Sequence, residues 1–467
     1  MQRAQMKTPR NRLTADASIA ERKAAGKALR RRVGFRALGN WRTPARRTDP
    51  VAVLKATDKE REAALLPIRY GRMLQSPFAF YRGAAAIMAR DLATARTSGI
   101  FVQACGDAHL MNFGGFATPE RRIAFDINDF DETLPAPWEW DVKRLAASFV
   151  VASRQNRLRK ADARAAAERC AQGYREHMRR YADMSPIEVW REHIDAEALI
   201  VSIHSRKWKK RLREQLAKTS LESSVEHHVP PKLVVFRAGV ARIEDKPPLV
   251  FHRKDLDAER HARVVRQAFH RYRDTLPDDR RVLLDRYALV DMAAKVVGIG
   301  SVGTLCAVLL MIAGKRDALF LQVKEARRSV LESFAGKSGY ANHGERVVVG
   351  QRLMQAASDM FLGWTTLRGR HFYIRQLNDM KIKPAVELLD AEGMGAYAEG
   401  CAWALARAHA KSGDAALISG YLGNTPAFDE AIARFALAYA DQNEHDYEAL
   451  TTAVKRGRIE VATGVSA

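Results

Sequence analysis

The pattern of apolar and polar positions predicts a chain with helices in two regions and a sheet between them. Apolar residues recur at helical spacing between 138 and 184, and again from 384 to about 456. Residues 288–326 instead contain three short runs that are rich in Val, Ile and Leu and are separated by glycine-bearing turns. Such runs are typical of buried strands. Two further apolar runs between 360 and 377 extend the prediction to five antiparallel strands.

One apolar stretch could be read as a membrane span. Residues 296–314 carry no charge over 19 positions, which approaches the length of a transmembrane helix. Three glycines in the first half of the stretch, and charged segments on both sides, favour two buried strands joined by a glycine turn. We therefore expect no membrane span.

The cysteines and the N-terminal segment predict the type of cellular compartment. The N-terminal segment lacks the apolar region of a signal peptide. The four cysteines are widely scattered and form no Cys-x-x-Cys pair, which argues against a zinc site or a disulfide framework. Both observations favour a reducing compartment, and we expect a cytoplasmic protein.

The net charge of +23 is unevenly distributed. Residues 1–50 hold 14 Lys and Arg against three Asp and Glu, so this segment alone contributes +11. A basic arm of this kind could contact nucleic acid, an anionic membrane or an acidic protein partner. A solvated tail without a partner is the alternative.

The strongest chemical signal is GDAHLMNFG at 106–114. Asp107 and Asn112 stand five positions apart on a predicted tight loop, between an apolar run at 100–105 and a short strand at 122–128. In phosphoryl-transfer enzymes of the protein-kinase type, a loop Asp orients the acceptor hydroxyl and a following Asn holds a metal ion. We therefore expect Asp107 to act as the base and Asn112 to offer its carbonyl oxygen to Mg²⁺.

An acidic cluster, FDINDFDE, follows at 125–132. Asp129 is the best candidate for a metal ligand, Asp126 precedes it on the strand and Asp131 follows. Neighbouring carboxylates repel one another unless a cation or a basic group is present, so the cluster itself favours a metal site. The alternative is an acidic loop that caps the helix beginning near Trp138.

A glycine-rich segment, GIGSVG at 298–303, lies between two of the predicted strands. Its backbone N–H groups could bind phosphates, and the candidate residues are Gly298, Gly300, Ser301 and Gly303. The later strand FLQVK ends in Lys324, which is similar to the phosphate-pairing lysine of kinases. We expect Glu345 to pair with Lys324, with Glu332 as the alternative. A core hairpin with an exposed lysine would give the same pattern without binding a nucleotide.

Three further residues are candidates for substrate contacts. Arg82 is set among aromatic residues beside Gly83 and could contact an anion. His409 and Asp414 lie on a later loop, where helix-end capping is the alternative to substrate binding.

These motifs carry a family resemblance. GDAHLMNFGG followed by INDFDETLPAPWEWDVKRLAAS resembles the aminoglycoside phosphotransferase and choline kinase branch of the kinase-like fold. The resemblance implies that Asp107 and His109 belong to the catalytic loop, that Asn112 and Asp129 bind the metal, and that Asp141 braces the loop. It also implies ATP and Mg²⁺ as nucleotide and metal. The whole chain is similar to a bacterial family known only as a domain of unknown function.

The order of the parts departs from that of kinases, because the predicted nucleotide lobe follows the catalytic loop by about 190 residues. We therefore expect an α+β, protein-kinase-like two-lobe fold that is circularly permuted. Its parts would be a basic N-terminal arm (1–50), a helical catalytic and metal-binding lobe (51–285), a five-stranded antiparallel nucleotide-binding lobe (286–380) and C-terminal helices that pack on the catalytic lobe (381–467).

The function expected from this combination is ATP- and Mg²⁺-dependent phosphoryl transfer to an unidentified hydroxyl acceptor, preferably a small molecule. One alternative is a catalytically silent kinase-like module whose basic arm binds nucleic acid or an acidic partner. The other is a metal-dependent phosphohydrolase that uses Asp107, His109, Asp126 and Asp129.

Overall fold

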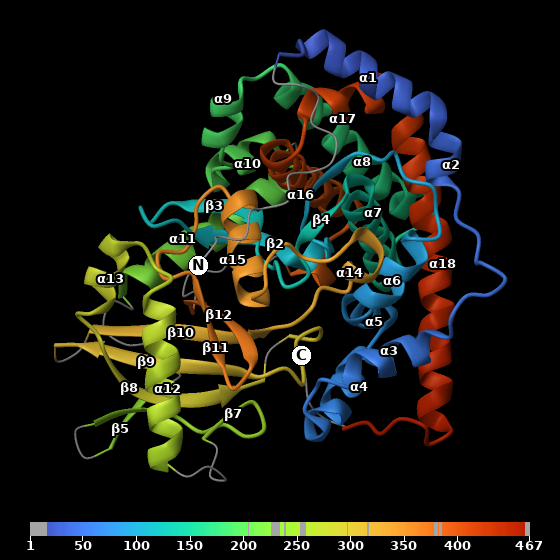
Figure 1. Cartoon of the computed structure of the whole chain (residues 1–467). Coiled ribbons are helices and arrows are strands. Elements are labelled where there is room, and N and C mark those ends of the chain that lie inside the picture. Colours follow the sequence, from blue (N-terminus) through green and yellow to red (C-terminus); the bar gives the residue numbers. More distant parts are fainter. Residues whose placement is uncertain are drawn as a thin grey trace.

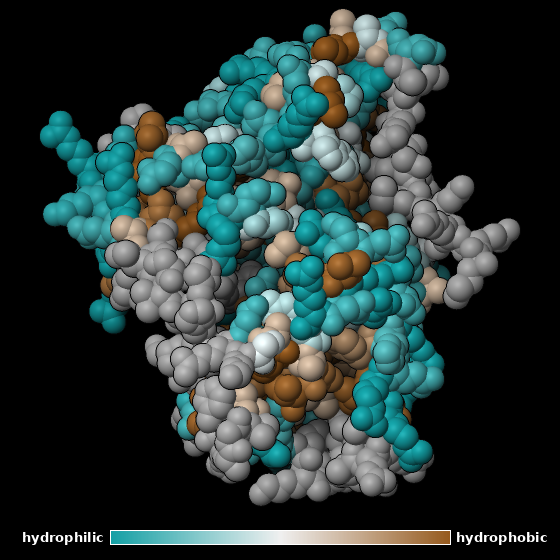
Figure 2. Space-filling model, turned by 90° about the vertical axis from the view of Figure 1, so that its left-hand side faces the viewer, coloured by the Kyte–Doolittle hydropathy of each residue, from teal (hydrophilic) through white to brown (hydrophobic). Residues whose placement is uncertain are grey.

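The computed structural model describes residues 16–203, 205–225, 234–237, 240–252, 258–296, 298–314, 317–377, 382 and 385–462. Within these residues the chain is a mixed α and β protein, in which helices gather at one end and an antiparallel sheet at the other (Figure 1). Hydrophilic residues cover most of the face shown in Figure 2, and hydrophobic side chains gather in a few places on it.

The core of the helical end is a bundle made from two distant parts of the chain. Its helices are α7 (Trp138–Gln155), α8 (Lys160–Ala182), α16 (Ala391–Ser412), α17 (Ala415–Leu422) and α18 (Ala427–Lys455). Helix α7 is buried on every side from Trp138 to Ser153, because α8, α16 and α18 all pack against it. The Trp138 ring stacks on Tyr174 of α8, with 5.5 Å between ring centroids. The last helices therefore complete the core around α7 and α8.

The remaining helices lie outside this bundle. Those before the first strand are α1 (Ile19–Arg32), α2 (Phe35–Gly39), α3 (Pro50–Asp58), α4 (Leu66–Met73), α5 (Pro77–Gly83) and α6 (Ala85–Leu92). Those that lie between α8 and residue 288 in the sequence are α9 (Pro186–Arg191), α10 (Ala196–Ser202), α11 (Arg206–Val225), α12 (Ala258–Arg273) and α13 (Asp278–Leu284). Two more, α14 (Glu332–Ala335) and α15 (His343–Met354), follow the third long strand.

Helix α1 shows what becomes of the basic segment that the sequence suggested as an arm. It packs closely against α17 at two glycines: a Cβ on Gly26 would lie 2.0 Å from the carbonyl oxygen of Leu417, and one on Gly420 would lie 2.1 Å from that of Lys23. From Asp16 onward the segment therefore belongs to the folded body, and the rest of the expected arm, residues 1–15, lies outside the described residues.

The sheet has six strands rather than the expected five. Its order is β11–β12–β10–β9–β8–β7, with every neighbouring pair antiparallel. The strands are β7 (Val250–Phe251), β8 (Ala288–Lys295), β9 (Cys306–Ala313), β10 (Asp317–Ala326), β11 (Gly363–Leu367) and β12 (Arg370–Gln376). The extra strand, β7, is only two residues long and lies at an edge, so it leaves no periodic pattern in the sequence.

The two faces of the sheet have different covers. Helix α12 lies across one face (Figure 1), where its Tyr272 joins a cluster with Leu309, Leu321 and Ile374. On the other face, a hairpin formed by β5 (Val234–Arg237) and β6 (Val240–Ile243) contributes Ile243 to a second cluster.

The apolar stretch at 296–314 forms a glycine loop followed by β9. Among the described residues, no helix combines the length and the apolar composition needed to cross a membrane.

Four short strands frame the loop that carries Asp107 and Asn112. β1 (Phe101–Ala104) pairs with β4 (Leu134–Pro137), and β2 (Phe113–Ala117) forms a hairpin with β3 (Ile123–Ile127). The loop runs from the end of β1 to the start of β2. The acidic cluster begins on β3 with Asp126 and continues into the segment before β4.

Candidate functional site

The loop between β1 and β2 is held from behind by the first turn of α7. Asp141 accepts backbone hydrogen bonds from Cys105 (2.7 Å) and Gly106 (3.0 Å). Gly106 has a φ of 82°, and a Cβ there would lie 2.5 Å from the carbonyl oxygen of Glu132, so a larger residue does not fit. This brace fixes where Asp107 leaves the backbone.

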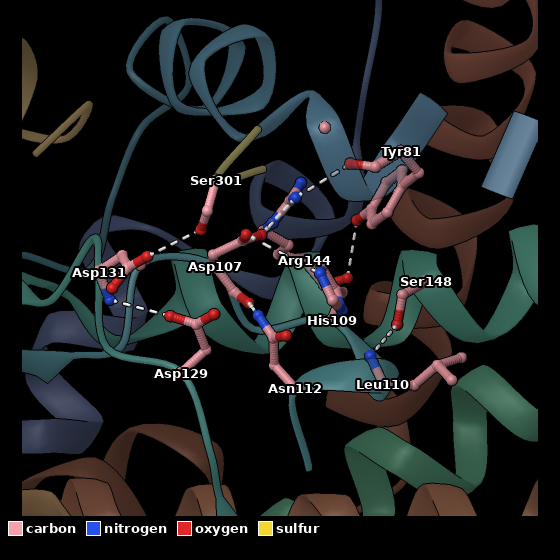
Figure 3. Close-up of polar contacts among 12 residues, drawn as sticks. Tyr81, Asp107, His109, Leu110, Asn112, Asp129, Asp131, Arg144, Ser148 and Ser301 are labelled. Atoms are coloured by element: carbon pink, nitrogen blue, oxygen red, sulfur yellow. Dashed lines mark hydrogen bonds and ion pairs between the residues drawn. The ribbon is translucent and has the colours of Figure 1, made fainter. Parts of the chain in front are cut away.

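The carboxylate of Asp107 is held by Arg144, one turn along α7 from Asp141 (Figure 3). The Arg144 Nε and Nη2 atoms lie 2.6 Å and 2.5 Å from Asp107 Oδ1. Arg144 is in turn fixed by Tyr81, whose ring lies under the guanidinium and whose carbonyl oxygen accepts from Nη2 at 3.1 Å. Burial raises the pKa of Asp107 and Arg144 opposes that shift. Among the described residues, Oδ2 accepts no hydrogen bond.

Asn112 and Asp129 lie on the same side of the loop (Figure 3). The Asn112 Nδ2 group donates to the carbonyl oxygen of Asp107 at 2.9 Å, so its amide oxygen is the atom available to a cation. Asp129 has a side chain that is 34% exposed, the most open of the carboxylates in the cluster. Burial raises the pKa of Asp129, and the nearby Asp131 adds to the shift. His109 is buried, with Nε2 3.9 Å from Asp107 Oδ2.

Asp131 joins the acidic cluster to the sheet. Its Oδ2 accepts from Lys324 Nζ at 2.8 Å and from Ser301 Oγ at 3.3 Å, and its Oδ1 accepts from the Tyr373 hydroxyl at 2.6 Å. Burial alone would raise the pKa of Asp131, but Lys324 and Tyr373 outweigh it and lower the pKa. The Lys324 Nζ atom is also 4.0 Å from Asp129 Oδ2. The lysine is therefore buried and paired, unlike the exposed lysine of the alternative interpretation.

The glycine loop between β8 and β9 lies directly over this cluster, and its carbonyl groups are tied to α4 and the residues before it. Arg72 Nη1 donates to the Gly298 carbonyl at 2.5 Å, and the Glu62 N–H donates to the Gly303 carbonyl at 2.8 Å. In the described part of the chain, no acceptor faces the backbone N–H groups of Gly300 and Ser301. These N–H groups are the donors that a phosphate would use.

The partner expected for Lys324 is not the one observed. Among the described residues, Lys324 forms ion pairs with Asp131 and Asp129 and with neither Glu345 nor Glu332. Glu332 instead accepts the backbone N–H of Ser329 at 3.3 Å. Helix α15 reaches the site through Arg346, whose Nη2 donates to the Asp131 carbonyl at 2.8 Å.

The expected metal role of Asp126 does not fit its surroundings. Its side chain is fully buried and ion-paired with Arg407, whose Nη2 lies 2.7 Å from Oδ2, and the same oxygen accepts the Ala356 N–H at 2.8 Å. This makes Asp126 a structural residue. In the described ranges, no group of three or more His, Cys, Asp and Glu side chains is arranged to hold a metal ion. Asn112 and Asp129 are the donors that remain.

His409 and Asp414 have structural partners. His409 is fully buried, with Nε2 3.2 Å from Asp141 Oδ2 and Nδ1 2.9 Å from the Tyr174 hydroxyl, so it supports the loop brace. Asp414 accepts the backbone N–H of Leu417 at 3.0 Å and caps α17. The capping alternative therefore fits Asp414, and neither residue is placed to contact a substrate.

Sequence reasoning missed Arg144, Tyr373 and Arg346. Arg144 could have been found, because it stands three residues after Asp141 and therefore on the same face of α7. Tyr373 is directly opposite Lys324 in the β10–β12 ladder, a relation that appears only once the strand register is known.

Comparison with known proteins places the chain in one family. A family model described as an uncharacterized protein conserved in bacteria (DUF2252) matches residues 61–453, and the chain belongs to that family. No curated protein and no solved structure shows a significant match.

Proposed function

We propose that this member of the bacterial family is an ATP- and Mg²⁺-dependent phosphotransferase of the kinase-like superfamily, acting on a hydroxyl acceptor. The observation that carries the proposal is the meeting of Lys324 and Ser301 at Asp131. It joins the glycine loop and the strand lysine to the acidic cluster that follows the Asp107 loop in the chain. Each of these is a part that phosphoryl transfer requires.

In this proposal Asp107 receives the proton of the acceptor hydroxyl at Oδ2. The acceptor oxygen then forms a bond to the γ-phosphorus while the bond from that phosphorus to ADP breaks. Arg144 opposes the burial that raises the pKa of Asp107, and it fixes the direction of the carboxylate through a hydrogen bond from Nε and an ion pair from Nη2, both to Oδ1. Asp141 and His409 hold the loop in place behind it.

The nucleotide phosphates would bind the free N–H groups of Gly300 and Ser301, with Lys324 nearby. Because Lys324 is already paired with Asp131, phosphates compete with a carboxylate for the same ammonium group. Glu345 has no part in this arrangement. Lys324 lies on the third of the strands β8, β9 and β10, and the glycine loop joins the first two, an order that matches kinases and supports a permuted kinase-like fold.

The residues available to Mg²⁺ are the Asn112 amide oxygen and the Asp129 carboxylate. This set fits Mg²⁺, which is commonly held by one or two carboxylates together with substrate phosphates. When bound, the ion would neutralise phosphate charge. With so few protein donors, metal binding would depend on the nucleotide. The small number of protein donors also weakens the phosphohydrolase alternative. That alternative used Asp126 as well, and Asp126 is ion-paired with Arg407.

The silent binding module remains the alternative. In the described part of its basic arm, α1 packs on α17 around Gly26, so a nucleic-acid or acidic partner would meet the face of α1 that is turned away from α17.

The test is ATP binding measured by calorimetry with and without Mg²⁺. The wild type should bind Mg·ATP, and Asp129→Asn should weaken that affinity at least about tenfold, or about 1.4 kcal/mol. The matched control is Asp441→Asn, which changes an exposed carboxylate on α18 and should leave affinity within about twofold. Absence of ATP binding, or equal affinity in all three proteins, would refute the proposal.

A further inference from the structure

Two arginines lie where the glycine loop meets α4 and α5. Arg72 on α4 is buried, and its Nη1 donates to the carbonyl of Gly298 at the start of the loop. Arg82 ends α5, and its carbonyl oxygen would be 3.8 Å from a Cβ on Gly300 at the tip of the loop. Both residues therefore lie at the edge of the candidate site.

Both groups lack a carboxylate partner. Among the described residues, neither Arg72 nor Arg82 forms an ion pair, and the Nε atom of each is buried without an acceptor. Neighbouring arginines do form ion pairs with carboxylates. Arg69 pairs with Asp58 at 2.6 Å, and Arg144 pairs with Asp107. Burying an unpaired charge is costly, so buried charges are normally paired.

The charges at this edge bear on one another. Burial lowers the pKa of Arg82, the Asp107 carboxylate opposes that shift, and Arg72 adds to it. Arg82 also follows Tyr81, whose carbonyl oxygen accepts from the Arg144 that holds Asp107, so the chain itself places Arg82 beside the proposed base. An oxyanion bound here would offer acceptors to the Nε groups of Arg72 and Arg82.

We propose that Arg72 and Arg82 bind an oxyanion group of the acceptor, so that the acceptor is a hydroxyl compound that already carries a phosphate or a carboxylate. This assignment rests on the proposed function, since it names the substrate class of the same site. The nucleotide phosphates are the other source of such an oxyanion. The acceptor is favoured because Lys324 and Asp129 lie at Asp131, whereas Arg82 follows Tyr81, whose carbonyl oxygen accepts from the Arg144 that holds Asp107.

The experiment uses inorganic phosphate as the probe, titrated by calorimetry at ionic strength held constant with chloride. The proteins are the wild type, Arg82→Gln and the control Arg164→Gln, which removes an exposed arginine on α8. Each titration is repeated with saturating Mg·ADP, and Mg·ATP affinity is measured separately. Arg82→Gln should fold normally, because the Arg82 side chain makes no hydrogen bond or ion pair with the described residues. A thermal melt checks this.

We expect Arg82→Gln to weaken phosphate binding at least about tenfold, with and without Mg·ADP, and to leave Mg·ATP affinity within about twofold. Arg164→Gln should match the wild type. Equal phosphate binding by wild type and Arg82→Gln would overturn the proposal. So would displacement of phosphate by Mg·ADP together with weakened Mg·ATP binding in Arg82→Gln, because the site would then belong to the nucleotide. If no nucleotide binds but phosphate binding still requires Arg82, the phosphotransferase proposal fails and the oxyanion site stands.

Discussion

Lys324 Nζ lies 2.8 Å from Asp131 Oδ2, and this buried ion pair joins two segments that are 193 residues apart in the chain. Burial alone would lower the pKa of Lys324, but Asp129 and Asp131 raise it well above its usual value. The lysine therefore stays charged beside the acidic cluster. It links the sheet to the acidic cluster beside the loop that carries Asp107.

Removing the lysine alone should be more harmful than removing the pair. We expect Lys324→Met to lower the free energy of unfolding by about 3 kcal/mol, because Asp131 is left without its cation. The double variant Lys324→Met with Asp131→Asn should recover most of that loss, since position 131 then carries no charge that needs a cation. Urea unfolding of both proteins checks this. Equal stabilities of the single and double variants would show that the pair is not coupled.

The same ion pair should make stability depend on pH. The pKa of Asp131 is lowered in the folded chain, so its contribution is fully present above its unfolded pKa of about 4 and is lost as the pH falls through the folded value. Urea unfolding of the wild type between pH 7 and about pH 3 should show a loss that Asp131→Asn lacks. Parallel curves for the two proteins would contradict this.

Asp126 and Asp129 should respond in opposite ways to the same substitution. Asp126→Asn should reduce stability by about 3 kcal/mol, because the buried guanidinium of Arg407 loses its counter-charge. The folded protein should retain its Mg·ATP affinity. Asp129→Asn should keep its stability, since Asp129 is partly exposed, and should lose Mg·ATP affinity. Loss of Mg·ATP affinity in fully folded Asp126→Asn protein would restore the metal role for Asp126.

Arg144 should act on the pH dependence of the reaction through Asp107. Because Arg144 opposes the burial that raises the pKa of Asp107, its removal should raise that pKa further. Basal ATP hydrolysis, with water as the acceptor, should rise with pH as Asp107 ionises. In Arg144→Gln this rise should move to higher pH. Arg154→Gln, a change at a partly exposed position on the same helix, is the control. An unshifted profile would show that Arg144 is only structural.

Asp141 should affect the reaction rate more than nucleotide binding. Asp141→Asn cannot accept both the Cys105 and the Gly106 N–H with two equivalent oxygens, so the loop loses part of its brace. We expect a stability loss of about 1–3 kcal/mol. Basal hydrolysis should fall while Mg·ATP affinity stays within about twofold. If Mg·ATP affinity fell as much as the rate of hydrolysis, the contacts of Asp141 would position the nucleotide site rather than Asp107.

Local patterns predicted the elements and the placing of the main chemical groups. The Val-, Ile- and Leu-rich runs predicted five of the six strands, and the spacing of Asp107 and Asn112 predicted the loop between β1 and β2. Lys324 was placed near the acidic cluster only through a resemblance, yet the structure brings the two together. Periodicity and turn residues are local signals, and these features depend mainly on them.

Features that depend on long-range packing were not predictable in the same way. Glu345 was chosen because it begins a long helix, but the rotation of α15 is fixed by burial of Val347, Val348 and Met354, and this turns Arg346 toward the site. Strand β3 is buried along its whole length, so Asp126 needed an internal partner. That partner, Arg407, stands 281 residues later, and no residue near Asp126 in the sequence indicates it.

The discontinuous bundle has a consequence for synthesis. Helices α16 and α18, which cover α7 and α8, and the lysine that pairs with Asp131 are all made long after the loop of Asp107. At about 5–20 residues per second, the 193 residues between Asp131 and Lys324 take about 10–40 s to translate. Throughout that interval the nascent chain exposes the apolar side of α7. We expect this emerging half to need chaperone protection until the ribosome has delivered the last helix.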